Sequence, residues 1–273
     1  MEYKNMQDKK VLGQQYKDSE KLDVRKNFHQ NYSTNPITYD DWILSKIHFP
    51  RGCHPLGCRI LEVGCGTGQL WKNQGELIDS FSELVLSDIS VGMVEQAKEN
   101  HLAKKNITCQ VIDTQEIPYP ENSFDLIIAN SMLYHIPHLK QALKEIHRVL
   151  KSDGIFYATT ASGSEGLMND ITGALYEMGL SETKSTAELS FSLENGGEML
   201  NHYFTSVERE LYEDHLEITN ANDIVEYIYS MSFMYNKLDA SHFYELLAYF
   251  EKRKDDLGII KIPKLYGMFI ASK

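Results

Sequence analysis

The 273-residue sequence predicts an α/β protein with a doubly wound, mostly parallel sheet of seven strands. Short apolar segments alternate with amphipathic helical segments between residues 59 and 161, which is typical of βαβ units. A glycine-rich turn, GCGTG at 64–68, follows the first apolar segment, and Asp88 and Asp113 close the next two. Ligands of such sheets bind at the carboxyl ends of the strands, so the expected site lies at these residues.

Each strand of the parallel part is recognised by its apolar run. Strands are expected at 59–63, 83–89, 107–113, 123–130 and 154–161. The segment 123–130 is nearly continuous in apolar residues, as in a strand buried on both faces. A turn at Asp153-Gly154 is expected to begin the fifth strand. Helices are expected at 39–49, 68–78, 90–100 and 138–150, the third capped by Ser90.

The pattern after residue 163 is less regular. Helices are expected at 165–180, 194–204, 222–236 and 241–258. Two further strands are expected at 207–218 and 264–273, and we expect them to pair antiparallel at the edge of the sheet.

Composition excludes several classes of partner. The formal net charge of −12 opposes binding to nucleic acid. No apolar run approaches the roughly 18 residues of a membrane span, and the N-terminus lacks the apolar core of a signal peptide. We therefore expect a cytoplasmic protein without a membrane or nucleic-acid partner. The spacing of Cys53, His54 and Cys58 does not match a zinc site, so we expect no metal and reduced thiols.

The glycine-rich turn differs from a phosphate-binding loop. A dinucleotide fingerprint would place its third glycine where Gln69 stands, and the Gly-Lys-Ser/Thr of a P-loop is absent. Glu62 precedes the turn, and its carboxylate would repel a phosphate but suit a cationic ligand. Asp88 follows the turn by about twenty residues, the place of a ribose-binding acid. With Asp113 and Gln115 able to meet a purine edge, the predicted ligand carries a cation, a ribose and a base.

Four segments carry a family resemblance: "ILEVGCGTG", the acid Asp88, "VIDTQEIPYPENSFDLIIANSMLYHI" and "EIHRVLKSDGIF". Over residues 58–162 the chain resembles class I S-adenosylmethionine-dependent methyltransferases of the type 11, UbiE-like, small-molecule branch. The resemblance implies a Rossmann-like methyltransferase fold and methyl transfer to oxygen, nitrogen or carbon of a small organic acceptor. The product would be S-adenosylhomocysteine. "NSMLY" stands where DNA-amino methyltransferases have Asn/Asp-Pro-Pro-aromatic, which again argues against nucleic acid.

Two other classes of function stay open. One is a protein that binds S-adenosylmethionine without transferring its methyl group. The other is a nicotinamide-dependent oxidoreductase, which the missing third glycine disfavours. The acceptor, the atom methylated and the oligomeric state are left open.

The resemblance also implies site residues. The glycine loop would line the methionine half of the cofactor, Asp88 would bind the ribose, and Asp113 would accept from the adenine amino group. The full set of predicted cofactor residues is Tyr32, Glu62, Gly64, Cys65, Gly66, Gly68, Asp88, Ile89, Met93, Asp113, Thr114, Gln115, Asn130 and Ser131. Within it, Ile89 and Met93 would flank the adenine.

His135 is the candidate general base, with Tyr134 beside it. The alternative is that His135 only packs near the cofactor.

The chain divides in this prediction into an N-terminal helical cap at 1–50 and a core at 51–273. A helical insertion at 219–257 would form a lid between the last two strands. The aromatic and Met-rich segment 227–235 either packs on a neighbouring helix or covers an apolar or aromatic acceptor.

Overall fold

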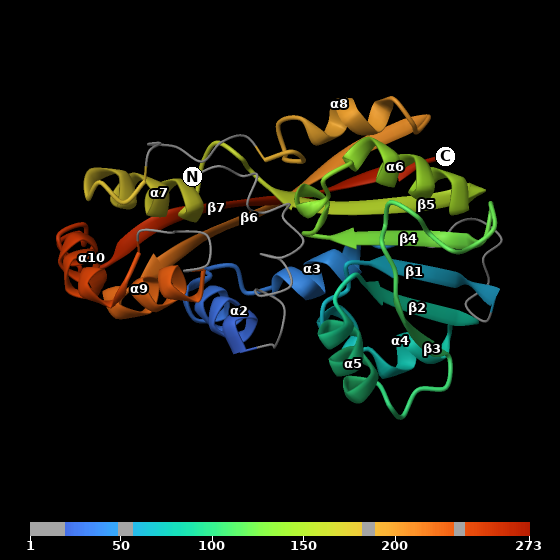
Figure 1. Cartoon of the computed structure of the whole chain (residues 1–273), viewed down its shortest axis with the longest axis horizontal. Coiled ribbons are helices and arrows are strands. Elements are labelled where there is room, and N and C mark those ends of the chain that lie inside the picture. The colour runs from blue at the N-terminus through green and yellow to red at the C-terminus, as the bar shows by residue number, and fades with distance from the viewer. Residues whose placement is uncertain (1–19, 49–56, 182–188, 232–237) are drawn as a thin grey trace. The chain divides into compact units, whose positions relative to one another are not determined.

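The computed structural model describes residues 20–48, 57–181, 189–231 and 238–273 (Figure 1). The chain forms two compact units. Unit 1 comprises residues up to 38 together with 161–189 and 212–266, and unit 2 comprises 39–160, 190–211 and 267–273.

The predicted seven-stranded sheet is confirmed, in the order β3-β2-β1-β4-β5-β7-β6 (Figure 1). Its strands are β1 (Arg59–Val63), β2 (Glu83–Asp88), β3 (Ile107–Val111), β4 (Phe124–Asn130), β5 (Leu150–Ala161), β6 (Ser206–Ile218) and β7 (Ile260–Ser272). The first five pair in parallel. The strand order reverses between β1 and β4, which is the switch point where ligands of such sheets bind.

The last two strands run in opposite directions, as predicted. The amide of Thr205, just before β6, donates to the carbonyl of Ser272 at the end of β7. Lys264, early in β7, pairs with Asp214, late in β6. β6 rather than β7 forms the sheet edge.

Helices cover both faces of the sheet in unit 2. They are α3 (Tyr39–Lys46), η3 (Gln69–Trp71), α4 (Gly75–Asp79), α5 (Val91–Asn100), η4 (Leu133–His135), α6 (Leu139–Val149) and α8 (Gly196–Asn201). The apolar face of α6 packs in one cluster with Leu61, Val63 and Val85. The alternate residues Ile60 and Leu84, on the opposite face, are equally buried, and α5 contacts β2 and β3.

Unit 1 has a core of its own. Its helices are α2 (Glu20–Tyr32), α7 (Leu167–Glu177), α9 (Ala221–Ser230), η6 (Ala240–His242) and α10 (Phe243–Glu251). Helix α9 packs against both α2 and α10. Phe28, Ile171, Ile228 and Phe250 belong to the buried cluster that joins these helices.

The structure corrects three local expectations. The strand β5 begins at Leu150, so the turn at Asp153-Gly154 is wrong; the extra residues enter an irregularity against β4. The helix expected at 68–78 is divided into η3 and α4. Cys58 is disulfide-bonded, which overturns the expectation of four reduced thiols, whereas Cys65 and Cys109 are free. Residues 53, 54 and 232–235 of the sequence predictions lie outside the described residues.

Candidate functional site

The glycine loop after β1 is built on left-handed backbone. Gly64, Gly66 and Gly68 have φ values of 64°, 56° and 72°, which side chains disfavour. A Cβ at Gly64 would lie 2.7 Å from Met132 Cγ. A Cβ at Gly66 would have no described atom within 4 Å. Gly66 therefore borders open space, and the backbone there is accessible to a ligand.

Asp88, the last residue of β2, is held against this loop. Its Oδ2 accepts from the Gly66 amide at 3.0 Å, and its Oδ1 accepts from the Ser90 amide at 2.8 Å. Burial raises the pKa of Asp88, while these backbone hydrogen bonds lower it. Each carboxylate oxygen keeps a further acceptor site, enough for the two adjacent hydroxyls of a ribose.

Apolar surface lies next to this carboxylate. Ile89 is 45% exposed although it is a large aliphatic residue. Met93 is fully buried in α5, whose N-cap Ser90 accepts from the Met93 amide. Ile89 therefore presents an apolar surface beside Asp88, whereas the Met93 side chain is not exposed.

Glu62 differs from the expectation of a standing negative charge. It is buried, and its Oε2 accepts from Nε1 of Trp71 at 2.6 Å. Burial raises the pKa of Glu62 to about 8, against the effect of the Trp71 hydrogen bond. Burial therefore disfavours the charged form of Glu62, whose carboxyl bonds to η3 beneath the loop.

Gln115 fixes the acid after β3 rather than facing a ligand itself. Its backbone and side-chain nitrogens donate to Oδ1 of Asp113 at 3.0 and 2.8 Å. Its Oε1 accepts from the His138 amide at 3.0 Å. Thr114 between them is buried. Gln115 therefore positions Asp113 and ties the loop after β3 to the start of α6.

The residues after β4 are also held in place. Asn130 Oδ1 accepts from the Thr159 hydroxyl at 2.7 Å, and Ser131 adopts a left-handed φ of 52°. The Ser131 amide donates to Thr159 Oγ1 at 2.9 Å. Cys65, in the glycine loop, is a buried thiol whose pKa is raised by burial, which disfavours the reactive thiolate.

His135 and Tyr134 lie in η4, after the same strand. Their ring centroids are 4.5 Å apart, and the Ser190 hydroxyl donates to the Tyr134 carbonyl. Tyr32 belongs to unit 1, whereas the other predicted site residues belong to unit 2. Its hydroxyl donates to Asp223 at 2.6 Å, and its ring packs on Phe28.

Three residues that support the site carry no signal in the sequence. Trp71, His101 and Met132 contact Glu62, Gly68 and Gly64 respectively. Each acts through a contact with a residue outside its own segment, which the sequence pattern does not reveal.

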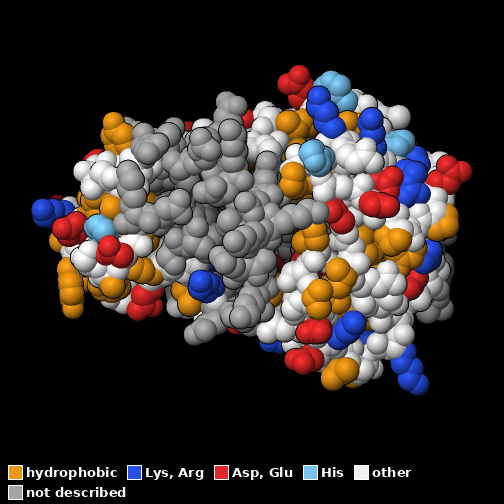
Figure 2. Space-filling view, in the orientation of Figure 1, with side chains coloured by type: hydrophobic (Ala, Val, Ile, Leu, Met, Phe, Trp, Pro, Cys, Tyr) orange, Lys and Arg blue, Asp and Glu red, His pale blue; other side chains and the backbone are white. Residues whose placement is uncertain are grey.

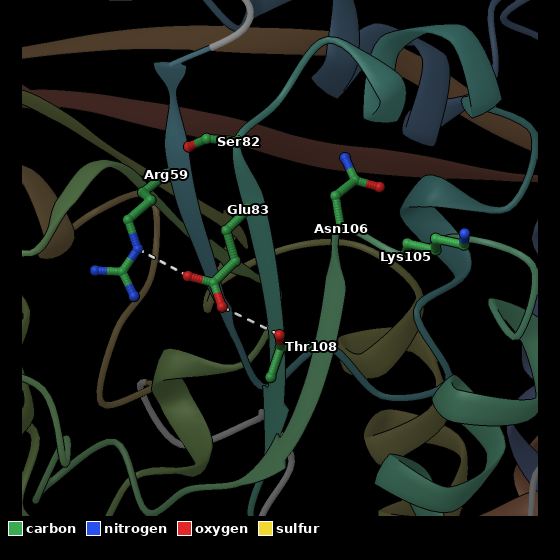
Figure 3. Close-up of a pocket in the computed structure, with 6 residues that line it drawn as sticks. All are labelled: Arg59, Ser82, Glu83, Lys105, Asn106 and Thr108. Atoms are coloured by element: carbon green, nitrogen blue, oxygen red, sulfur yellow. Dashed lines mark hydrogen bonds and ion pairs between the residues drawn. The ribbon is translucent and has the colours of Figure 1, made fainter.

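A separate polar pocket lies at the opposite, amino ends of the strands (Figure 3). Arg59 pairs there with Glu83 at 2.8 Å, and Glu83 accepts from the Thr108 hydroxyl at 3.1 Å. These groups satisfy one another, so the pocket is a polar surface feature and not the site predicted from the sequence.

The surface and the helices bear on the predicted partners. Figure 2 shows Lys and Arg side chains interspersed with Asp and Glu on the visible face of the described residues. Among the described helices, none has the length and apolar character needed to cross a bilayer. No group of three or more His, Cys, Asp or Glu side chains suited to a metal occurs within the described ranges.

The described residues fit S-adenosylmethionine, the cofactor that the resemblance implies. The open space over Gly66, the carboxylate of Asp88 and the exposed face of Ile89 adjoin one another at the switch point. Asp113 supplies a second acid after the next strand.

Comparison with known proteins agrees with this geometry. Residues 61–158 match the family model described as a methyltransferase domain, the type 11 group. The demethylmenaquinone methyltransferase of Symbiobacterium thermophilum is 32% identical over 122 residues, 44% of this chain and 47% of that protein. The mitochondrial arginine-hydroxylase NDUFAF5 of Rattus norvegicus is 30% identical over 103 residues, 38% of this chain and 29% of that protein. The chain thus spans less than half the length of these relatives.

The fold is shared more widely. The solved structure of YcgJ from Bacillus subtilis has a TM-score of 0.59 at 18% identity, covering 85% of this chain and 96% of that one. At this identity the likeness concerns the fold alone, and it supports the Rossmann-like architecture of the sheet and its helices.

Proposed function

We propose that this chain is a methyltransferase that uses S-adenosylmethionine, because residues 61–158 match the model of the type 11 methyltransferase domain. It transfers the methyl group to a small organic acceptor and releases S-adenosylhomocysteine. The observation that carries the proposal is the joint placement of Asp88 and the Gly66 amide at the switch point of the sheet.

In this proposal the chain's own residues bind and orient the cofactor. The Asp88 carboxylate accepts from the ribose hydroxyls, and Ile89 and Asp113 contact the adenine. The left-handed backbone at Gly66 leaves room for the methionine portion. The sulfonium of the bound cofactor supplies an already activated methyl group, so positioning of the acceptor provides most of the catalysis.

Three parts of the proposal concern the acceptor. His135 removes a proton from the acceptor where the reaction requires it, with Tyr134 beside it. Residues 1–50 act as a cap and 219–257 as a lid. The acceptor is apolar or aromatic, consistent with the aromatic residues in both segments. The name of the Symbiobacterium relative makes demethylmenaquinone the first acceptor to assay.

The first test is calorimetric titration with S-adenosylhomocysteine. We expect micromolar binding by the native chain and a loss of roughly tenfold or more in Asp88→Asn, since the ribose hydroxyls lose a charged acceptor. Asp153→Asn, at an exposed acid of β5, is the matched control and should bind normally. Absence of binding at millimolar ligand, or unchanged affinity in Asp88→Asn, would refute the proposal.

The relative named as an arginine-hydroxylase favours a second candidate function. In that candidate the same cofactor is bound, and no methyl group leaves it. Incubation with S-adenosylmethionine labelled in its methyl group separates the two, because only a methyltransferase moves the label to an acceptor. Retention of all label on the cofactor across the acceptor panel would favour the second candidate.

A further inference from the structure

Unit 1 contains a group of buried polar side chains that the proposed cofactor site does not use. Arg25 and His29 lie four residues apart on α2, so their side chains emerge on the same face of that helix. The His29 ring contacts the rings of Tyr227, on α9, and Tyr266, on β7. Lys264 and Asp214 also act electrostatically on His29.

His29 has a hydrogen-bonding atom without a partner. Its Nδ1 is inaccessible to solvent and bonds to nothing in the described part of the chain, although the residue as a whole is only half-buried. Its Nε2 lies 3.5 Å from the Tyr227 hydroxyl. If that hydroxyl donates to Nε2, the proton of the neutral ring resides on Nδ1. Burial and the Lys264 charge lower the pKa of His29 to about 3, which keeps the ring neutral.

Arg25 is a buried cation with little to bind. Its side chain donates to the Ser230 carbonyl at 3.3 Å, and within the described ranges it has no carboxylate partner. A guanidinium carries five N–H donors, so most of the Arg25 donors have no protein acceptor within the described residues. Arg25 is nine-tenths buried, and burying such a charge without a counter-ion is unfavourable.

The one acid that acts electrostatically on His29 is already paired with another cation. Asp214 accepts from Lys264 at 2.8 Å and from the amides of Thr34 and Asn35, each at 3.0 Å. The charges that act on His29 therefore sum to one excess positive charge, from Arg25, Lys264 and Asp214.

We propose that unit 1 carries a binding site in which Arg25 and the Nδ1–H of His29 hold an anionic oxygen of an aromatic ligand, a carboxylate or a phenolate. Arg25 and His29 place donors on one helix face that lack acceptors in the described part of the chain, and such donors bind an anion rather than a cation. The rings of Tyr227 and Tyr266 around His29 favour an aromatic ligand.

The test uses the full chain with benzoate and 4-nitrophenolate as probes, and benzamide and nitrobenzene as their uncharged counterparts. Calorimetry measures affinity, and absorbance follows 4-nitrophenolate. We expect both anions to bind and the uncharged counterparts to bind at least about tenfold more weakly. Binding of one anion only identifies the oxygen as carboxylate or phenolate and still supports the site. Equal binding of charged and uncharged probes, or no binding of either anion, would overturn it.

Substitutions then locate the site. Arg25→Met and His29→Phe should each weaken anion binding roughly tenfold. Arg25→Lys keeps the positive charge and should bind the anions better than Arg25→Met. His29→Asn keeps a donor near the position of Nδ1 and should bind them better than His29→Phe. Asn27→Ala, at an exposed position of the same helix, is the control. Native affinity in both Arg25→Met and His29→Phe would contradict the assignment.

A measurement on the native chain guards against variants that do not fold. Histidines labelled with ¹⁵N give a long-range ¹H–¹⁵N spectrum, in which His29→Asn assigns the His29 signals. Benzoate or 4-nitrophenolate should shift the Nδ1 signal of His29, and an unchanged signal at saturating probe would refute the site. Titration with S-adenosylhomocysteine runs in parallel. If S-adenosylhomocysteine does not bind but the anion probe still shifts the Nδ1 signal, the methyltransferase proposal is rejected and the anion site is kept. If S-adenosylhomocysteine binds but the Nδ1 signal does not shift, the anion site is rejected and the methyltransferase proposal is kept.

Discussion

The three glycines of the loop after β1 should respond differently when each is changed to alanine. All three have positive φ, but their surroundings differ. The new methyl group at Gly64 would lie 2.7–2.8 Å from three Met132 atoms, and at Gly68 it would lie 2.7 Å from His101 Nε2. At Gly66 the new methyl group would meet nothing described within 4 Å. Glycine at position 66 is therefore required by the positive φ of its backbone and by any ligand that occupies the space beside it, and not by neighbouring protein atoms.

These distances set the expected magnitudes. Gly66→Ala should lower the free energy of unfolding by about 1–2 kcal/mol, the cost of left-handed backbone with a side chain. Gly64→Ala and Gly68→Ala add overpacking of about 1–3 kcal/mol to that cost. His101 also contacts the Gly68 carbonyl at 3.0 Å, so it has little freedom to move aside. Gly66→Ala should nevertheless weaken binding of S-adenosylhomocysteine directly, by roughly tenfold or more, because the new methyl group occupies space that the ligand needs.

Urea unfolding gives the stabilities, and calorimetry gives the affinities of the folded variants. Gly179→Ala is the matched control, since Gly179 in unit 1 has φ of 70° and a Cβ added there would likewise meet no described atom within 4 Å. It should show the same stability loss as Gly66→Ala with native affinity. Native affinity in Gly66→Ala, or a stability loss as large as that of Gly64→Ala, would refute the reasoning.

Two further predictions concern buried ionisable groups. Glu62→Gln keeps an acceptor for the Trp71 side chain but removes the ionisable group. The pKa of Glu62 rises from 4.5 to about 8 on folding, so Glu62 lowers the free energy of unfolding of the native chain as pH rises through that window, and the variant lacks this effect. The variant should therefore gain up to about 1.4 kcal/mol per pH unit relative to the native chain, measured by urea unfolding between pH 5 and 8, and parallel curves would contradict this. Lys264→Met leaves the fully buried Asp214 unpaired and should cost about 3–5 kcal/mol. Arg253→Met, in a more exposed pair, should cost at most about 1 kcal/mol, and equal losses would show that burial does not decide the difference.

The sequence predicts the sheet and the place of the site because both depend on local patterns. The apolar runs identify the five parallel strands, the two later strands are also predicted, and the residues that end β1, β2 and β3 identify the expected ligand edge. The N-cap role of Ser90 is also confirmed by its bond from the Met93 amide. These features involve residues close in sequence, where periodicity and capping rules apply.

The features that the sequence does not predict depend on contacts between distant residues. Glu62 reads as a charged ligand residue until its burial and its bond to Trp71 are known. Helix α2 was expected only as part of a general cap, since its sequence is polar and only weakly amphipathic. Its place in unit 1 comes from packing against α9, about two hundred residues later. Tyr32 is predicted as a ligand contact because its hydrogen bond to Asp223, which is distant in the sequence, cannot be foreseen from the sequence.

The predicted cofactor residues share one physical property that bears on the proposed function. Amides of Gly66 and Ser90 orient Asp88, and the side chain of Gln115 orients Asp113. The Thr159 hydroxyl orients Asn130. Side chains held in this way lose little further rotational freedom when a ligand binds, so more of the interaction energy appears as affinity. The pair of Arg25 and His29 is the opposite case, because its donors lack acceptors in the described chain. A ligand at Arg25 and His29 would therefore supply acceptors that the described chain lacks, whereas a ligand at the cofactor residues would add hydrogen bonds to side chains that already have partners.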